Sequence, residues 1–456
     1  THCESSAASD VYKRQVESGA KATKITEYLD KNFPDQDWEV APCLGHIRDL
    51  PDDENAVNPE DWTDLSWEET QKGKKTVREL RKICKTTDTI YLATDPDREG
   101  EAIAWHLLSD FSEKKLLKDK SIKRISFNEI TSSAIKHAVN SPREIDQDLV
   151  DAYLARRILD HLIGFKVSPL VWRHAPPAKS AGRVQSPSLR IICERETERD
   201  KHIKEEYWPI SSKFAFKDFT FEAELIKSND SDLKKKPVSS EDQKNKIQSE
   251  LKSSEFYIHS IETKPQSSSP NPPFRTSTLQ MTASSSLGFT ADRTMRSAQN
   301  LYEAGLITYL RTDGINISTS PNTGEPFSEE NPGPPPLEEI RNVISEKFGK
   351  KFLSDDVRVY KSKVKNSQEA HEAIRPTNIK TYPEKINLGQ DEQKLYTLIW
   401  NRTVASQMSN SEHERKKIVV HSENDKFVLN ASSRKTIFEG FELSLIHISE
   451  PTRLNP

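Results

Sequence analysis

The 456-residue sequence predicts a multidomain protein that combines an α/β domain, helical domains and a β-rich segment. Three patterns support this fold class. Helix-like and strand-like stretches alternate over 16–145, which is typical of a parallel sheet covered by helices. Apolar residues then recur at helical spacing over 146–206 and again over 271–407. Between these regions, residues 207–262 alternate in polarity as β-strands do.

The first region has its expected elements in the order of a parallel-sheet domain. We expect helices over 17–32, 76–84, 100–108 and 131–139, and strands over 38–41, 89–93 and 122–127. Thr131 is a suitable N-cap for the last of these helices, because its hydroxyl can accept a hydrogen bond from the first helical turn. The apolar strand over 89–93 is expected to be buried.

The later regions are separated by segments with other compositions. Residues 228–252 are charged and are expected to be a linker, and the Pro- and Ser-rich residues 265–273 are expected to be a hinge. A loop rich in Pro, Gly, Ser and Asn interrupts the second helical region over 318–336.

Composition narrows the classes of function. The net charge of −4 argues weakly against a nucleic-acid-binding protein, but residues 155–190 contain seven Lys or Arg and one acid. Such a stretch can neutralise phosphates, or can be a solvated basic face. No stretch approaches the roughly 20 apolar residues of a membrane span, so no membrane partner is expected. The four cysteines form no C-x-x-C pair, so we expect a reducing compartment and no zinc in this chain.

The most informative motif is TDPDREGEAIAWHL, which follows the buried strand directly. It places the carboxylates of Asp95, Asp97 and Glu99 within one turn, at the carboxyl end of a strand. Carboxylates this close repel one another unless a hard cation lies between them, and Mg²⁺ prefers such oxygen ligands. The alternative is an acidic surface turn.

Three segments carry a resemblance to a known family. The acidic turn resembles the Toprim triad of bacterial type IA DNA topoisomerases. QNLYEAGLITYLRTDGINIS over 299–318 resembles the active-site segment of that family, and QEAHEAIRPT over 368–377 resembles its histidine block. The resemblance covers about 16–442.

This resemblance implies a toroid of four domains. They would be a Toprim domain over 16–145, part of a helical DNA-binding domain over 146–206, a β-rich hinge arch over 207–270 and 408–442, and a helical lid over 271–407. Residues 1–15 and 443–456 resemble translated sequencing-adapter sequence, so we expect them to lie outside the fold. The first strand of the Toprim sheet is therefore expected to be missing.

Tyr309 is the predicted nucleophile. A phenolic oxygen can form a covalent phosphodiester intermediate and leave again, which conserves the energy of the cleaved bond. Arg311, two residues later, can hold phosphate oxygens in the transition state. A tyrosine in such a context is otherwise a core residue. The resemblance implies attachment to the 5′-phosphate and a supporting shell of Gln299, Glu303, Thr308 and Asp313, of which Glu303 and Asp313 can equally be surface carboxylates.

The resemblance also assigns roles near the N-terminus. Glu17 would face the acidic triad, either ligating Mg²⁺ with Asp95, Asp97 and Glu99 or handling the proton of the leaving 3′-oxygen. Lys21 would offer positive charge to the scissile phosphate. Without the resemblance, Glu17 and Lys21 would be an ordinary i,i+4 helix pair.

Further residues are expected to contact DNA. His46, in GHIRDL, and His371, in EAHEAIRP, match family elements that lie on the bound strand. On one helical face Asp160 could orient Arg156 towards a phosphate, with Arg157 beside them. Phe165 and Trp172 can stack on bases or belong to a helix core. The remaining expected contacts lie in one phosphate-binding segment: Ser180, Ala181, Gly182, Arg183, Val184 and Gln185.

Together these features predict an isomerase that relaxes negatively supercoiled DNA at single-stranded regions through a transient 5′-phosphotyrosine. No phosphate-binding loop of the G-x-x-x-x-G-K-[ST] type occurs, so Mg²⁺ but no nucleotide is expected. The alternatives are a decatenase of the topoisomerase III type, a crippled fragment that only binds single strands, and another Toprim enzyme such as a primase or nuclease. We expect a monomer in the bacterial cytoplasm with the nucleoid, or in an organelle.

Overall fold

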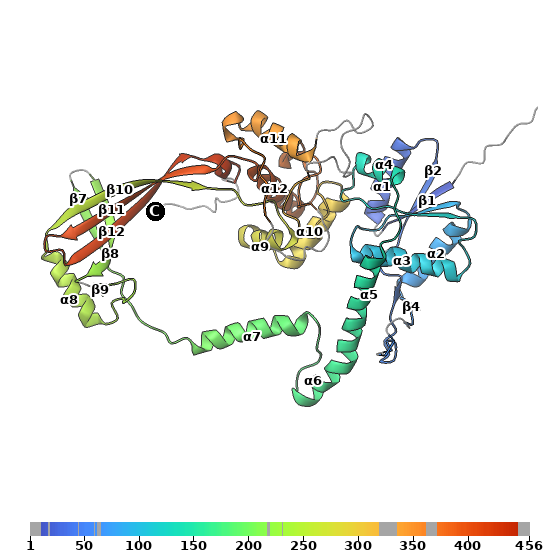
Figure 1. Ribbon diagram of the computed structural model, residues 1–456, viewed down its shortest axis with the longest axis horizontal. Helices are drawn as coiled ribbons and strands as arrows, with labels where there is room; N and C mark the ends of the chain where they lie inside the picture. Colours follow the sequence, from blue (N-terminus) through green and yellow to red (C-terminus); the bar gives the residue numbers. More distant parts are fainter. Residues whose placement is uncertain are drawn as a thin grey trace, which may run out of the picture. The chain divides into compact units, whose positions relative to one another are not determined.

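The structure, a computed structural model, describes residues 11–16, 19–43, 45–58, 60–61, 65–216, 219–229, 231–318, 335–361 and 372–445. The chain divides into two compact units, which are described separately (Figure 1). Unit 1 comprises residues 1–190, 271–407 and 444–456, and unit 2 comprises 191–270 and 408–443. The predicted domain boundaries and the toroid remain predictions.

The α/β part of unit 1 contains a parallel four-stranded sheet, with the strand order β2-β1-β5-β6. Its strands are β1 (Val11–Val16), β2 (Asp37–Pro42), β5 (Thr89–Leu92) and β6 (Ser121–Arg124). Side chains of β5 alternate between two packed faces, as expected of a buried parallel strand. Ile90 and Leu92 belong to a core cluster, whereas the Tyr91 ring packs on Trp38.

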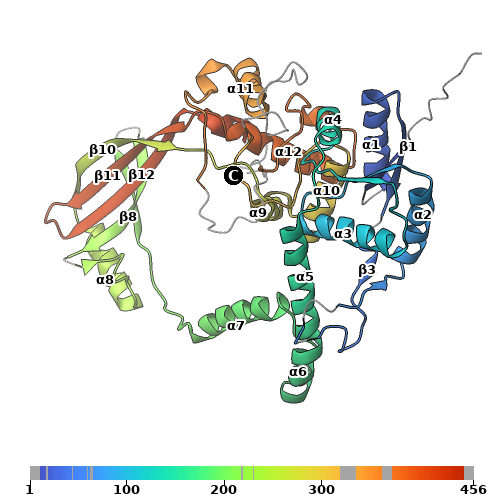
Figure 2. The same cartoon turned by 45° about the vertical axis from the view of Figure 1, so that its right-hand side comes forward.

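Helices cover both faces of this sheet (Figures 1 and 2). On one side α1 (Gly19–Asn32) packs on α4 (Ser132–Asn140), and on the other α2 (Gly73–Lys85) and α3 (Arg98–Glu113) share the core of Ile90 and Leu92. The predicted cap is confirmed, because the Thr131 hydroxyl accepts a hydrogen bond from the Ala134 N–H. A two-stranded ribbon, β3 (Arg48–Asp49) with β4 (Glu68–Glu69), completes this part.

The expectation that the first strand is missing was wrong. Residues 11–16 form β1, which pairs in parallel with β2 on one side and β5 on the other. Most of this strand lies within residues 1–15, which were expected to lie outside the fold. The ladder consists of main-chain hydrogen bonds, so a segment of another sequence can occupy the position if its residues tolerate an extended backbone.

The helical parts of unit 1 follow. The helix α5 (Gln147–Leu162) continues through a π-helical turn, η1 (Ile163–Val167), into α6 (Ser168–His174). The helix α7 (Gln185–Lys201) begins in unit 1 and ends in unit 2, and after unit 2 the chain returns to form a second group of helices, which we call the lid after its predicted role. The lid contains α9 (Thr276–Leu287), α10 (Ala291–Glu303), α11 (Pro336–Lys347) and α12 (Gln390–Ala405), with short 3₁₀ turns η2 (Lys350–Phe352) and η3 (Pro383–Lys385).

Unit 2 is an antiparallel sheet with one helix packed on it. The strand order is β10-β11-β12-β8-β7, and β9 pairs with β8. The elements are β7 (Ser211–Phe216), β8 (Phe219–Ser228), β9 (Ser231–Asp232), α8 (Glu241–Lys252), β10 (Phe256–Ser268), β11 (Ser411–Ser422) and β12 (Phe427–Phe438), followed by the 3₁₀ turn η4 (Gly440–Ser444).

Two predictions for unit 2 were wrong. The charged segment 228–252 is not a linker throughout, because α8 forms in it and buries Ile247 and Leu251 against the sheet. The expected hinge at 265–273 begins inside β10, where Pro265 pairs with Glu414. A proline is tolerated there because β10 is an edge strand, whose outer side needs no amide donors.

Within the described part of the chain, no helix is both long enough and apolar enough to span a membrane.

Candidate active site

The acidic turn is fixed by local hydrogen bonds at the start of α3. The Asp97 carboxylate caps the helix by accepting from the Gly100 N–H at 2.8 Å, and the Thr94 hydroxyl donates to the Gly100 carbonyl at 2.6 Å. A Cβ at position 100 would lie 2.2 Å from the Asp95 carbonyl oxygen. Glycine is therefore required at this close approach, and it holds Asp95 and Asp97 on one tight turn.

The lid places Tyr309 directly against this turn. Tyr309 is only 3% exposed, and its hydroxyl donates a hydrogen bond to the Asp97 carboxylate. Its main-chain N–H donates to the Asn128 carbonyl at 2.8 Å, which fixes the segment on the sheet domain. Burial, followed by the negative charges of Asp97 and Asp95, raises the pKa of the Tyr309 phenol above its usual range. The phenol thus keeps its proton in this arrangement.

Asp95 has two further partners that the sequence analysis did not assign to it. The Lys21 ammonium lies 2.5 Å from its carboxylate, and the Tyr302 hydroxyl donates to the same oxygen at 3.3 Å. The Tyr302 and Tyr309 rings meet edge to face at 5.5 Å. Tyr302 was missed, although it lies in the recognised block and precedes Tyr309 by seven residues. Lys21 is 2% exposed, so it is part of the buried site rather than of a surface pair.

Glu99 lies at the more exposed side of the turn. The His46 Nε2 lies 2.9 Å from one of its oxygens, and the Arg156 guanidinium donates to the other at 3.2 Å. The hydrogen bond with His46 is the main reason that the pKa of Glu99 lies below its usual range. The His46 ring stacks on Tyr153 at 5.3 Å, which orients it towards the acidic turn.

The predicted three-carboxylate cluster is not formed. Among the described residues, no group of three or more His, Cys, Asp or Glu is placed to hold a metal ion. Asp95, Asp97 and Glu99 instead face different partners, as described above, and Glu17 lies outside the described residues. Toprim domains generally bind Mg²⁺. The donor chemistry still fits this ion, because Mg²⁺ is commonly held by one or two carboxylates together with waters and substrate phosphates.

A cleft opens beside the phenol. It is lined from the sheet domain by Asp97, Arg98, Glu99 and Arg156, and from the lid by Thr276, Arg311, Thr312 and Asp313. The Arg311 guanidinium is 61% exposed and lies 3.7 Å from Asp97. It can therefore reach a phosphate in the cleft while remaining next to the carboxylate that holds Tyr309.

The predicted supporting shell is only partly gathered here. Thr308 is buried, and its hydroxyl donates to the Ala373 carbonyl at 3.0 Å. Asp313 is exposed and lines the cleft. Gln299 donates to Glu303 at 2.8 Å along α10. His371 lies outside the described residues, so its predicted role remains a prediction.

A buried arginine joins the lid to the sheet domain. Arg375 donates to Glu129 at 3.2 Å and to Glu372 at 2.8 Å, and its main-chain groups bond Thr308 in both directions, at 2.9 and 3.0 Å. Desolvation opposes its charge, but the two carboxylates hold the pKa of Arg375 above its ordinary value. Nearby Gly305 has φ +71° and approaches the Ile130 carbonyl so closely that a Cβ would lie 2.5 Å from its oxygen.

The predicted pairing of Asp160 with Arg156 was wrong. Asp160 accepts two hydrogen bonds from Arg183, at 2.7 and 3.1 Å, while Arg156 turns to Glu99. Arg157 donates to Asp49 at 2.6 Å. Sequence spacing within one helix could not reveal these partners, because each lies outside α5.

The remaining predicted DNA contacts are placed near the surface. Trp172 is 56% exposed and donates its indole N–H to the Lys179 carbonyl, so it is not a core residue. Phe165 is half-buried and packs on His161 at 4.6 Å. The phosphate-binding segment is exposed or half-buried at each of its positions: Ser180, Ala181, Gly182, Arg183, Val184 and Gln185.

Comparisons with known proteins agree with this arrangement. The family model described as DNA topoisomerase matches residues 144–453, and the model of the Toprim domain matches 16–130. DNA topoisomerase 1 from Rickettsia bellii is 44% identical over 93% of this chain, and DNA topoisomerase 1 from Zymomonas mobilis is 41% identical over 93%. The chain covers 52% of the length of the first relative and 33% of the length of the second. It therefore spans about half of the first relative and about a third of the second.

A solved structure supports the same relationship. Full-length topoisomerase I from Thermotoga maritima matches with a TM-score of 0.74 and 35% identity, over 95% of this chain and 67% of that one. The matches cover both the acidic turn and the segment of Tyr309. The chain therefore belongs to the bacterial type IA DNA topoisomerase family and includes its Toprim domain.

Proposed function

We propose that the protein of which this chain is a part relaxes negatively supercoiled DNA without ATP, by cutting one strand through Tyr309, passing the other strand and resealing. One observation carries the proposal. The Tyr309 hydroxyl donates to Asp97, a residue 212 positions away in the sequence, so a nucleophile from the lid meets the carboxylates of the Toprim turn.

The chemistry follows from the groups around the phenol. Tyr309 Oη attacks the scissile phosphorus, the bond from phosphorus to the 3′-oxygen breaks, and the phenolic proton passes to Asp97. Arg311 stabilises the charge that builds on the phosphoryl oxygens. Lys21 adds positive charge beside Asp95, and Glu17 remains the predicted donor of a proton to the leaving 3′-oxygen. Resealing reverses these steps.

Mg²⁺ would be held by the carboxylates of the acidic turn other than the proton-accepting Asp97, namely Asp95 and Glu99, and would supply charge neutralisation beside the cleft. The DNA partner would be a single-stranded region, with phosphates along Arg156, Arg183 and the exposed segment that follows Trp172. As expected from the sequence, the protein would act as a monomer in the bacterial cytoplasm or in an organelle.

A labelling experiment tests the nucleophile. A single-stranded oligonucleotide is incubated with the chain and Mg²⁺ and then denatured. A 3′-end label should migrate with the protein, whereas a 5′-end label should be released on a fragment with a free 3′-hydroxyl. Tyr309→Phe should abolish the adduct. Tyr360→Phe is the matched control, because this lid phenol donates to the Ser406 carbonyl at 2.8 Å and does not line the cleft.

The Tyr309→Phe variant and two further assays separate the alternatives. Cutting that persists in Tyr309→Phe would contradict the proposal and favour a nuclease. A decatenase of the topoisomerase III type would unlink joined circles faster than it relaxes a plasmid. A chain that binds single strands and forms no adduct, next to a full-length parent that does, would be the crippled fragment considered from the sequence.

A further inference from the structure

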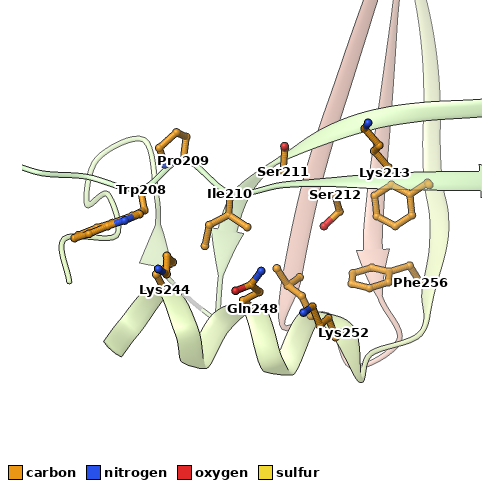
Figure 3. A pocket seen from close by; sticks show the side chains of 12 residues that line it. Trp208, Pro209, Ile210, Ser211, Ser212, Lys213, Lys244, Gln248, Lys252 and Phe256 are labelled. Atoms are coloured by element: carbon orange, nitrogen blue, oxygen red, sulfur yellow. The ribbon is translucent and has the colours of Figure 1, made fainter. Parts of the chain in front are cut away.

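A pocket of unit 2 contains none of the residues that line the candidate active site. It lies between α8 and the segment that leads into β7 (Figure 3). The side chains of Lys244 and Gln248 point from α8 towards this segment, Lys252 lines the pocket from the end of the same helix, and Trp208 and Phe256 lie at the two ends of the pocket. None of the residues that line the pocket is acidic.

Helical spacing explains why one face of α8 carries both charge and apolar surface. Lys244, Gln248 and Lys252 follow one another at intervals of four residues, so they form one row. Leu251 lies beside this row and anchors the helix in the core of the sheet. The two lysines are thus held about 12 Å apart along the helix axis.

One of the two lysines lies over one of the two aromatic rings. The Lys244 ammonium lies 6.0 Å from the centre of the Trp208 ring. Its other partner is Glu241, at 3.0 Å, whose side chain is 69% exposed and lies outside the pocket lining. Such an exposed ion pair is weak and can be exchanged for a stronger anion.

We propose that this pocket binds a stretch of single-stranded nucleic acid, with phosphates on Lys244 and Lys252 and bases on Trp208 and Phe256. Two ammonium groups at opposite ends of one pocket fit a chain of repeated anions better than a single phosphate. Flat rings beside them fit bases, because stacking on aromatic side chains combined with a basic groove is how single strands are bound without sequence preference. The choice of nucleic acid over another polyanion rests on the proposed function.

The test is made on the full chain carrying Tyr309→Phe, so that no strand is cut. Oligothymidylate containing 5-iodouracil is bound, irradiated and mapped by peptide sequencing. We expect crosslinks at Trp208 or Phe256. Binding constants are obtained from the yield of these crosslinks at salt concentrations from 50 to 200 mM. The slope of the logarithm of the binding constant against the logarithm of the salt concentration should be smaller in magnitude by about 1.4 in the double variant Lys244→Gln/Lys252→Gln, because two phosphate contacts are lost at about 0.7 each.

A second double variant controls for net charge. Lys246→Gln/Lys264→Gln removes two lysines of unit 2 that do not line the pocket, and should leave the crosslinks unchanged. The proposal is overturned if neither aromatic residue is crosslinked, or if oligoglutamate of equal length protects the lysines from acetylation while oligothymidylate does not. Because Tyr309 adducts are scored separately in the parent chain, either failure leaves the proposed cleavage standing, and loss of the adduct alone leaves the pocket standing.

Discussion

The contact between lid and Toprim domain and the interior of unit 2 are held together by different forces. Between lid and Toprim domain, charged and hydroxyl side chains meet: Tyr309 with Asp97, Tyr302 with Asp95, and Arg375 with Glu129. Unit 2 is held by antiparallel main-chain ladders and an apolar cluster that includes Phe427 and Leu429. Polar side chains that separate can form new contacts with water, metal or phosphate, so the net change in free energy is small. Opening an apolar core exposes apolar surface to water, which is strongly unfavourable. If the proposed function holds, the surface that would part to admit DNA is thus the polar one.

The largest effect on stability should follow from removing the buried guanidinium of Arg375. We expect Arg375→Met to destabilise unit 1 by about 3–5 kcal/mol, because it leaves Glu129 and Glu372 without this guanidinium in a buried place. Thermal unfolding measures the loss, and the yield of the Tyr309 adduct should fall with it.

A matched arginine on the lid surface is the control. Arg293 donates to Asp391 at 2.6 and 2.7 Å, but both side chains are substantially exposed. Arg293→Met should therefore change stability far less. Equal effects of the two substitutions would show that burial is not what makes the Arg375 contact important.

A smaller loss is expected from the apolar core of unit 2. Leu429 is fully buried on β12, so Leu429→Ala should cost about 3 kcal/mol through lost burial and a residual cavity. The adduct yield on a short oligonucleotide at 25 °C should stay unchanged, since Leu429 is not among the residues that line the cleft. Ile437→Ala, at an exposed position of the same strand, should be nearly neutral. A fall in adduct yield with Leu429→Ala would show that the two units do not act independently.

The smallest effect concerns the pairing of Asp160 with Arg183. The hydrogen bond from Arg183 holds the pKa of Asp160 below its usual value, so the pair contributes stability at pH values above about 4. That contribution is lost as the pH falls through the lowered pKa. The difference in melting temperature between the parent chain and Asp160→Asn should be constant from pH 8 to pH 5 and shrink below it. Asp151→Asn is the control, because Asp151 accepts from Gln147 rather than from an arginine.

The sequence was sufficient for several local features of unit 1, although not for its first strand. The strand over Thr89–Leu92, the cap at Thr131 and the turn of Asp95 and Asp97 could be predicted because each depends on neighbouring residues. In unit 2, α8 was missed, because Ile247 and Leu251 are its only buried residues and give a weak helical pattern. The extension of β10 through Pro265 depends on its edge position, which no local pattern reveals.

Partners across the fold were harder to predict. Tyr309 and Arg311 came from a recognised segment, but the contacts of Tyr302 with Asp95 and of Arg375 with Glu129 span 207 and 246 residues. Asp160 was given the wrong arginine for the same reason. Side-chain pairs of this kind are set by the packing of whole domains, so neither spacing nor composition contains them.

The hydrogen bond from the Tyr309 hydroxyl to Asp97 helps to keep the phenol protonated. If Tyr309 is the nucleophile, a phenol that is protonated, buried and bound to a carboxylate would stay unreactive until a DNA backbone enters beside it. Under the proposed function, activation of Tyr309 and entry of the DNA strand would then be a single event, so that no strand would be cut before it is bound.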